Sequence, residues 1–263
     1  MPLLSIRSLT KIYPHRQDAF GGSHGGELRA VDDVSLDIEP GETLGLVGES
    51  GSGKSTLGRL ILRLIEPTSG AVTYEGRDLL AMRGSELRHA RRELQIIFQD
   101  PFGSLDPRFR VLDVVTEPLV IHEKLSPEER RLQAAHLMGA VGLDESALAR
   151  YPHEFSGGQR QRIGIARALA LRPRFIVADE PVSALDVSVG AQIVNLMQRL
   201  QREFGLTYLF ISHSMPVVRY LANRIAVMKN GQLVELGSTE QITTYPREAY
   251  TRSLLAATPE LNI

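Results

Sequence analysis

A glycine-rich loop between a short apolar stretch and a helical pattern restricts the fold more than any other feature of the chain. The apolar stretch is Thr43–Val47, and the loop after it reads Gly48-Glu49-Ser50-Gly51-Ser52-Gly53-Lys54-Ser55-Thr56. Glycines let backbone N–H groups approach an anion closely, and a helix that follows presents its positive N-terminal end to that anion. The strand–loop–helix order therefore predicts a phosphate-binding loop (P-loop) rather than a purely structural glycine loop.

The residue types at the end of this loop indicate a nucleotide with its metal. In P-loop nucleotidases the lysine contacts the β- and γ-phosphates, and the serine after it is a ligand of Mg²⁺. We therefore expect Lys54 to bind these phosphates, Ser55 to bind Mg²⁺ and Thr56 to contact the α-phosphate. The expected cofactors are ATP and Mg²⁺.

Composition excludes several other classes of protein. The 263 residues approach the upper end for one compact domain, roughly 250–300 residues. The net charge of -1, from 30 basic and 31 acidic side chains, does not favour a dedicated nucleic-acid binder, so no nucleic-acid partner is expected. Cysteine is absent, which excludes disulfides and thiolate metal sites. Neither a signal peptide nor a run of ~20 apolar residues is found, so a membrane role is expected to depend on partners.

Hydrophobic patterning predicts alternating strands and helices around a helical segment. Strands are expected at 4–12, 30–38, 43–47, 71–74, 95–98, 174–178, 207–211, 225–228 and 232–235, and helices at 56–64, 84–94, 159–171 and 190–204. Residues 101–154 are predicted to be mainly helical, with Pro107, Pro118, Pro127 and Pro152 as breaks. Asn230-Gly231 predicts a hairpin turn, and a short helical tail is expected from Ser238 onward. His15 and His24 are weak metal candidates in a loop that is otherwise interpreted as a solvated insertion.

Polar side chains follow three of the predicted strands. Asp179 and Glu180 end the apolar run that begins at Phe175, and this placement predicts a Mg²⁺-side acid and a general base for the attacking water. Gln99 is predicted to touch Mg²⁺ or that water, and His213 to bond to the γ-phosphate. The alternatives are exposed acids at a strand end and a structural histidine.

A second glycine-rich turn, Phe155-Ser156-Gly157-Gly158-Gln159, lies far downstream of the first. Ser156 is a good N-cap for the helix after it, and the two glycines permit an anion to approach the helix N-terminus. The alternative is a capped helix with no ligand. One nucleotide needs only one P-loop, so the second turn suggests a site that two ATPase subunits share.

The whole chain resembles the ATP-binding subunit of an ABC transporter. Six segments carry the resemblance in family order: Gly48–Thr56 resembles Walker A, Gln99 the Q-loop, Phe155–Gln159 the signature, Phe175–Glu180 Walker B, Ser183-Ala184-Leu185-Asp186 the D-loop, and His213 the switch histidine. Gln99–Arg108, Ala178–Ser188 and Tyr245–Leu255 resemble the peptide and nickel importer branch more closely. Departures from the pattern are Phe155 for leucine, Ala178 for a larger apolar residue, and Ser214 where aspartate is usual.

The resemblance implies an α/β fold, a P-loop NTPase (RecA-like) core with an antiparallel β subdomain and an inserted helical subdomain. As a single ABC ATPase domain, 1–263, the chain would divide into a nucleotide-binding core with the β subdomain (1–100 and 157–235), a helical signature subdomain (101–156) and a short C-terminal tail (236–263). Tyr13 occupies the position of the aromatic residue that stacks on adenine.

The implied function is that of an ATP-binding and hydrolysing subunit that energises an importer of dipeptides, oligopeptides or related small solutes. Two ATPase subunits would pair head to tail, with Ser156, Gly157, Gly158 and Gln159 acting on the ATP held by the partner. A paralogue is favoured over a second copy as that partner. Two transmembrane permease subunits, gripped near 101–110, and an external substrate-binding protein would complete the system, with the ATPases peripheral on the cytoplasmic face of the cell membrane.

Other functions stay open at this point. They are a nickel or metal-chelate importer ATPase, a soluble ABC ATPase that acts on nucleic acid or ribosomes, an exporter or lipoprotein-release ATPase, and a small-molecule kinase. The kinase leaves the signature and the D-loop without a role. The sequence does not name the cargo.

Overall fold

The computed structural model describes residues 1–14, 27–100 and 103–257. They form two compact units, one of residues 1–87 with 211–263 and one of residues 88–210. The metal candidates His15 and His24 lie outside the described residues, as do Pro101 and Phe102 of the Q-loop segment. Among the residues that are described, no helix is long and apolar enough to cross a membrane.

The first unit contains an antiparallel sheet of four strands in the order β2-β1-β4-β5. The strands are β1 (Leu4–Tyr13), β2 (Leu28–Ile38), β4 (Ser69–Tyr74) and β5 (Arg77–Asp78). Leu4 pairs with both Ile38 and Tyr74, and all three side chains are fully buried. The apolar side chains of β1 at Leu4, Ile6 and Leu9 are also fully buried, so one face of the sheet supplies the core. The predicted antiparallel β subdomain is confirmed.

The P-loop follows a fully buried strand in the same unit. This strand, β3 (Thr43–Val47), runs parallel to β9 (Arg224–Lys229), and β9 forms an antiparallel hairpin with β10 (Gln232–Ser238). The turn residues Asn230 and Gly231 have φ of 48° and 84°, as a type I′ hairpin turn requires. The predicted hairpin is therefore confirmed. Four helices within the described residues complete the unit: α1 (Lys54–Ile61), α7 (Met215–Leu221), and, in the tail, α8 (Thr239–Thr244) and α9 (Ala249–Ala256).

The second unit pairs buried strands with long helices. Its strands are β6 (Leu94–Ile97), β7 (Phe175–Asp179) and β8 (Thr207–Ile211, with Ile211 assigned to the first unit), and β6 and β7 run parallel. Helices α5 (Gly157–Leu169) and α6 (Val187–Phe204) belong to this unit, and α2 (Gly84–Glu93) leads into it. Ala90 alone is buried on α2, as expected for a solvated helix.

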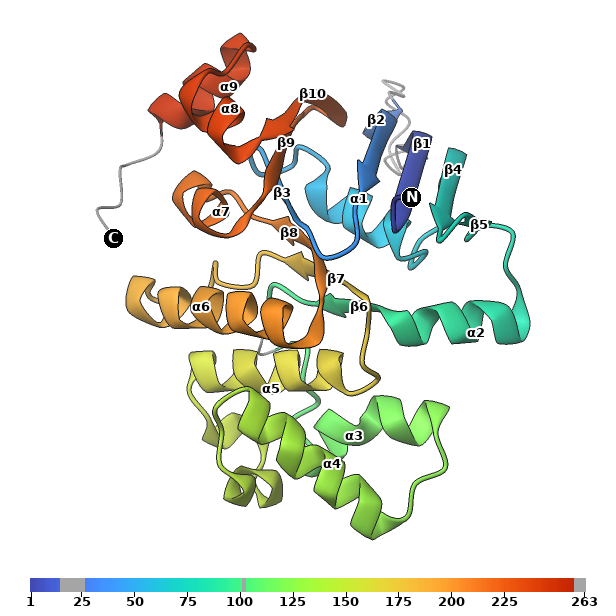
Figure 1. Ribbon diagram of the computed structural model, residues 1–263, viewed down its shortest axis with the longest axis vertical. Coiled ribbons are helices and arrows are strands. Elements are labelled where there is room, and N and C mark those ends of the chain that lie inside the picture. The colour runs from blue at the N-terminus through green and yellow to red at the C-terminus, as the bar shows by residue number, and fades with distance from the viewer. Residues whose placement is uncertain (15–26, 101–102, 258–263) are drawn as a thin grey trace, which may run out of the picture. The chain divides into compact units, whose positions relative to one another are not determined.

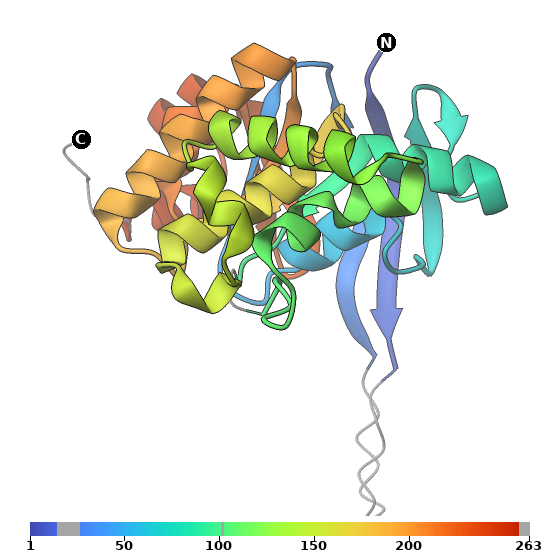
Figure 2. The same cartoon turned by 90° about the horizontal axis from the view of Figure 1, so that it is seen from below.

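A helical segment lies between β6 and the signature. It comprises α3 (Val111–His122), α4 (Pro127–Ala140) and two 3₁₀ helices, Glu145–Ala149 and Pro152–Glu154. Ser126 and Glu129 form a capping box at the start of α4, with Pro127 at the first helical position, so the sequence fixes this N-terminus locally. Helix α4 lies beside α5 in both views (Figure 1, Figure 2), and α3 contacts both helices. The mainly helical character predicted for 101–154 is confirmed for residues 103–154, the part of that range that the structure describes.

Several predicted boundaries are wrong. Helix α1 begins at Lys54 and α5 at Gly157, each two residues before its predicted start. The reason is that Gly53 and Ser156 are the N-cap residues, so each helix begins directly after its cap. Pro118 lies inside α3 rather than between helices, because burial of Val114, Val115 and Leu119 outweighs one lost backbone hydrogen bond. Phe98 lies after β6 and is 38% exposed.

Candidate functional site

Tight backbone packing explains two of the three glycines in the P-loop. A Cβ atom on Gly48 would lie 2.1 Å from the carbonyl oxygen of Met228, and one on Gly53 would lie 2.1 Å from that of Ala30. A Cβ atom on Gly51 would meet nothing within 4 Å, but its φ of 81° favours glycine for conformational reasons. The loop is thus pressed against β9 and β2, and its shape depends on residues that lack side chains.

Lys54 folds back over the loop. Its side chain is 4% exposed, and its ammonium group donates hydrogen bonds to the carbonyl oxygens of Gly48 (2.8 Å) and Glu49 (2.7 Å). The Ser52 hydroxyl accepts a third at 3.3 Å. The first turn of α1 carries no acidic residue, so its positive end is not neutralised there. A buried cation inside a ring of backbone groups at a helix N-terminus fits the phosphate chain of ATP.

Two more predicted residues belong to this unit. Tyr13 ends β1 with 37% of its surface exposed, and the Lys11 ammonium lies 5.1 Å from the centre of its ring. His213 is exposed between β8 and α7. Next to it, the Ser214 N–H donates to the Ser212 hydroxyl at 3.0 Å, which fixes the turn that carries the histidine. The roles of Tyr13 and His213 stay predictions.

In the second unit, the structure brings two predicted residues together. Glu180 directly follows Asp179, which is 3% exposed at the end of β7. The Gln99 side-chain amide donates a hydrogen bond to the Glu180 carboxylate at 3.3 Å, across 81 positions of sequence. Glu180 has a left-handed φ of 48°, which is uncommon for a residue with a side chain and often marks a functional turn. The end of β7 therefore presents a carboxylate held by a neutral amide.

The D-loop continues this turn and ends as a helix cap. The Ser183 N–H and hydroxyl both donate to the Glu180 carbonyl oxygen, at 3.2 Å and 3.1 Å. At the other end, the Asp186 carboxylate accepts from the Val189 N–H at 2.9 Å and caps α6. The Val189 N–H and, next, the Ser188 hydroxyl lower the pKa of Asp186, so the cap stays ionised. Ala184 and Leu185 lie between these two anchors.

The signature opens α5 through a reciprocal pair of hydrogen bonds. The Ser156 hydroxyl accepts from the Gln159 N–H at 3.4 Å, and the Gln159 side chain accepts from the Ser156 N–H at 3.1 Å. Gly157 and Gly158 form the first helical turn after the Ser156 cap. A Cβ atom on Gly158 would lie 2.3 Å from a methyl carbon of Val189 on α6. Close packing between α5 and α6 thus requires glycine here.

Comparison with known proteins identifies the family. The family model described as ABC transporter matches residues 31–183, more than half of the chain. The chain belongs to the ABC transporter family. It is an ATP-binding cassette, the ATPase of that family, as the order of its motifs predicts.

Individual relatives agree with this result. The cassette is 54% identical over 236 residues to the oligopeptide transport ATP-binding protein OppF of Bacillus subtilis, across 89% of this chain and 77% of OppF. It is 49% identical over 258 residues to the glutathione import ATP-binding protein GsiA of Pectobacterium atrosepticum, but spans only 41% of GsiA. Among solved structures, a dimeric post-hydrolysis structure of the ATP-binding cassette MJ0796 bound to ADP and Pi matches with a TM-score of 0.78 and 33% identity, over 90% of this chain and 98% of that one. The predicted α/β P-loop fold and importer branch are confirmed.

Sequence reasoning missed a partly buried arginine in the cassette. The Arg167 guanidinium, on α5, donates to the Ser104 carbonyl oxygen at 2.7 Å, and this bond joins the signature helix to the Q-loop segment. Burial lowers the pKa of Arg167, and Glu117 partly offsets this effect. The available signal was an arginine among the apolar residues of the buried helix face. Gln161, also on α5, is 2% exposed.

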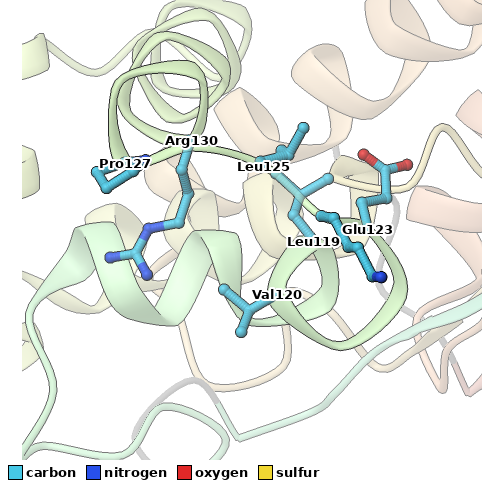
Figure 3. Close-up of a pocket in the computed structure, with 7 residues that line it drawn as sticks. Leu119, Val120, Glu123, Leu125, Pro127 and Arg130 are labelled. Atoms are coloured by element: carbon cyan, nitrogen blue, oxygen red, sulfur yellow. The ribbon is translucent and has the colours of Figure 1, made fainter.

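A pocket of about 330 Å³ beside the α3–α4 turn contains none of the predicted site residues. Figure 3 shows Leu119 and Val120 of α3 facing Pro127 and Arg130 of α4 around it. Two of its charged groups already have partners, Arg130 with Asp113 and Glu123 with Arg92, each at 2.6 Å. It is therefore a weak candidate for a charged ligand.

Within the described residues, no group of three or more acidic or histidine side chains is arranged to hold a metal. Mg²⁺ commonly uses one or two protein carboxylates together with substrate phosphates. The Asp179 carboxylate and the Gln99 amide oxygen of the second unit, and the Ser55 hydroxyl of the first, are each of the donor type that Mg²⁺ accepts.

Proposed function

We propose that this cassette hydrolyses ATP to energise the import of peptides through a membrane permease. The observation that carries the proposal is the 54% identity to OppF over 89% of the chain, since OppF is named as an oligopeptide transport protein. GsiA, named for glutathione import, supports small peptides as the cargo class, because glutathione is itself a tripeptide. The segments Gln99–Arg108 and Tyr245–Leu255 support the same branch.

The residues of the P-loop, Gly48 to Thr56, bind the nucleotide in this proposal. Lys54 holds the β- and γ-phosphates, the backbone of Glu49, Ser50, Gly51, Ser52 and Gly53 surrounds them, and Tyr13 stacks on adenine. Bound Mg²⁺, held by Ser55, Asp179 and Gln99, would supply charge neutralisation to the phosphates. Glu180 orients the attacking water and accepts its proton, and the amide of Gln99 keeps the Glu180 carboxylate in place. His213 donates to the γ-phosphate.

The signature acts on the nucleotide of a second ATPase subunit. The MJ0796 structure supports pairing, because it is described as dimeric with ADP and Pi bound. Ser156, Gly157, Gly158 and Gln159 contact the γ-phosphate held by that partner, for which we favour a paralogue. The capped start of α5 suits this role, since a helix N-terminus attracts anions. The D-loop, Ser183 to Asp186, lies in the same contact between the subunits.

Two permease subunits and an external binding protein complete the proposed importer. The cassette attaches to the cytoplasmic side of the permeases through the segment around 101–110, of which residues 103–110 are described. In this arrangement the permeases and the binding protein select the cargo.

Coexpression with permease, binding-protein and partner ATPase genes tests the proposal. The purified complex is assayed for ATP hydrolysis with dipeptides, an oligopeptide, glutathione or a nickel chelate. Stimulation by peptides supports peptide import. Stimulation by the nickel chelate alone assigns the cassette to a metal importer, and copurification with ribosomes or DNA without permeases contradicts an import function.

A further inference from the structure

The C-terminal tail is anchored to the β9–β10 hairpin by a buried carboxylate. Glu235 of β10, 9% exposed, accepts hydrogen bonds from the backbone N–H groups of Arg247 (2.8 Å) and Glu248 (3.2 Å). These residues immediately precede α9, so both bonds fix the start of that helix. Figure 1 shows α8 and α9 next to β10. Hydrogen bonds to a charged acceptor are stronger than those to a neutral one, which makes this anchor a firm one.

From this helix the tail reaches the P-loop itself. The Tyr250 hydroxyl on α9 accepts a hydrogen bond from the Glu49 N–H at 3.2 Å, between residues 201 positions apart. The ring of Tyr250 lies under the ammonium of Lys229, which is 4.6 Å from the ring centre and ends β9. The ring position is therefore set by the hairpin, and the hydroxyl position by the loop.

The peptide units of Glu49 and Ser52 are held from outside the loop as well as from within. The Glu49 carbonyl oxygen accepts from Lys54 at 2.7 Å, while its N–H donates to Tyr250. On the other side of the loop, the Gly231 N–H of the hairpin turn donates to the Ser52 carbonyl oxygen at 3.0 Å. The tail and the hairpin thus support the loop at two points, and only the support from the tail depends on a side chain.

We propose that Tyr250 is a positioning residue for the P-loop, through which the C-terminal tail sets the affinity of the cassette for ATP. With its hydroxyl on the Glu49 N–H, the first half of the loop keeps the path that lets the following N–H groups converge on phosphate. Loss of this bond releases the loop before binding, and ATP then has to order it, which weakens affinity. The inference rests on ATP binding at the P-loop, which is part of the proposed function.

The test compares Tyr250→Phe with a matched control, Tyr245→Phe. The first variant removes the hydroxyl and keeps the ring on Lys229. The second removes the same group from the same tail, at a side chain that is 72% exposed. We measure ATP affinity of the full chain by equilibrium binding, and hydrogen exchange of the Glu49 amide without nucleotide.

For Tyr250→Phe we expect ATP to bind about three- to tenfold more weakly, the range for one net hydrogen bond, with faster exchange at Glu49. Tyr245→Phe is expected to match the wild type in both measurements. Equal or tighter ATP binding by Tyr250→Phe overturns the inference, and so does an equal loss in Tyr245→Phe. If the wild type itself fails to bind ATP, both the proposed function and the inference are overturned. If the wild type and Tyr250→Phe bind ATP equally well, only the inference is overturned.

Discussion

The side-chain amide of Gln99 donates a hydrogen bond to the carboxylate of Glu180, with the nitrogen and oxygen 3.3 Å apart. The two residues follow neighbouring parallel strands, β6 and β7, and parallel strands place their carboxyl ends at one edge. A neutral donor fixes the carboxylate without neutralising it. In the proposed mechanism Glu180 is the general base, and the Gln99 amide holds its carboxylate in place.

Replacement of this base tests its role. Glu180→Gln is expected to bind ATP as the wild type does, while ATP turnover falls by about 10²–10³-fold, the usual loss for a preorganised transition-state group. Equilibrium ATP binding and phosphate release measure the two effects separately. Near-normal turnover would remove Glu180 from its assigned role.

The amide partner has a smaller predicted effect. Gln99→Ala leaves the Glu180 carboxylate without this donor, so we expect lower kcat with little change in ATP affinity. Gln95→Ala is the matched control, because Gln95 lies on β6, the strand that Gln99 follows, and among the bonds described its side chain bonds only the local backbone at Arg91. Equal kcat in both variants would show that the Gln99–Glu180 bond does not matter for turnover.

Ser156 combines a structural role with a proposed role in the paired subunit. Ser156→Ala is expected to cost about 1 kcal/mol of unfolding free energy through the lost cap, and also to reduce ATPase of the paired assembly. Ser238→Ala removes the same type of cap from α8 and is expected to lower stability without lowering ATPase. Denaturant unfolding and phosphate release distinguish these outcomes.

A bulky residue at position 156 tests whether the signature acts on the nucleotide of the partner subunit. Ser156→Arg is expected to impair ATPase of the assembled pair and to leave ATP binding by the isolated chain intact. If the isolated chain loses ATP binding, the signature acts on its own nucleotide and the shared-site model is wrong.

Two glycines on α5 predict opposite effects on stability. Gly158→Ala places a Cβ atom 2.3 Å from Val189, and such overpacking costs about 1–3 kcal/mol. Gly164→Ala meets nothing within 4 Å and is expected to stabilise the helix by about 0.5–1 kcal/mol. Thermal unfolding of the two variants measures the difference. If both variants shift the melting temperature in the same direction, the proposed α5–α6 packing is incorrect.

Local sequence signals predicted much of the fold. Strands β3 and β8 match their predicted bounds, because each is a short apolar run with a clear end. The hairpin at Asn230-Gly231 was predictable because few residue pairs accept two positive φ values. Helix starts were less certain, since Gly157 has a low helix propensity that the Ser156 cap overrides.

The contacts between distant segments were not predictable from one sequence. The Tyr250–Glu49 bond joins residues 201 positions apart, and the Arg167–Ser104 bond spans 63 positions. Neither follows from the period of a helix or strand, because tertiary packing decides where these side chains end. The sequence motifs identified the candidate site residues. The residues that hold them in place could be identified only from the folded structure.

Uptake of labelled oligopeptide into vesicles tests the central claim most directly. The vesicles contain the permeases, the partner ATPase and this cassette, with ATP inside and peptide-loaded binding protein outside. We predict uptake that requires ATP and that is lost when the cassette carries Glu180→Gln. Uptake at the wild-type rate with Glu180→Gln, or no uptake by a wild-type complex that hydrolyses ATP, would contradict the account.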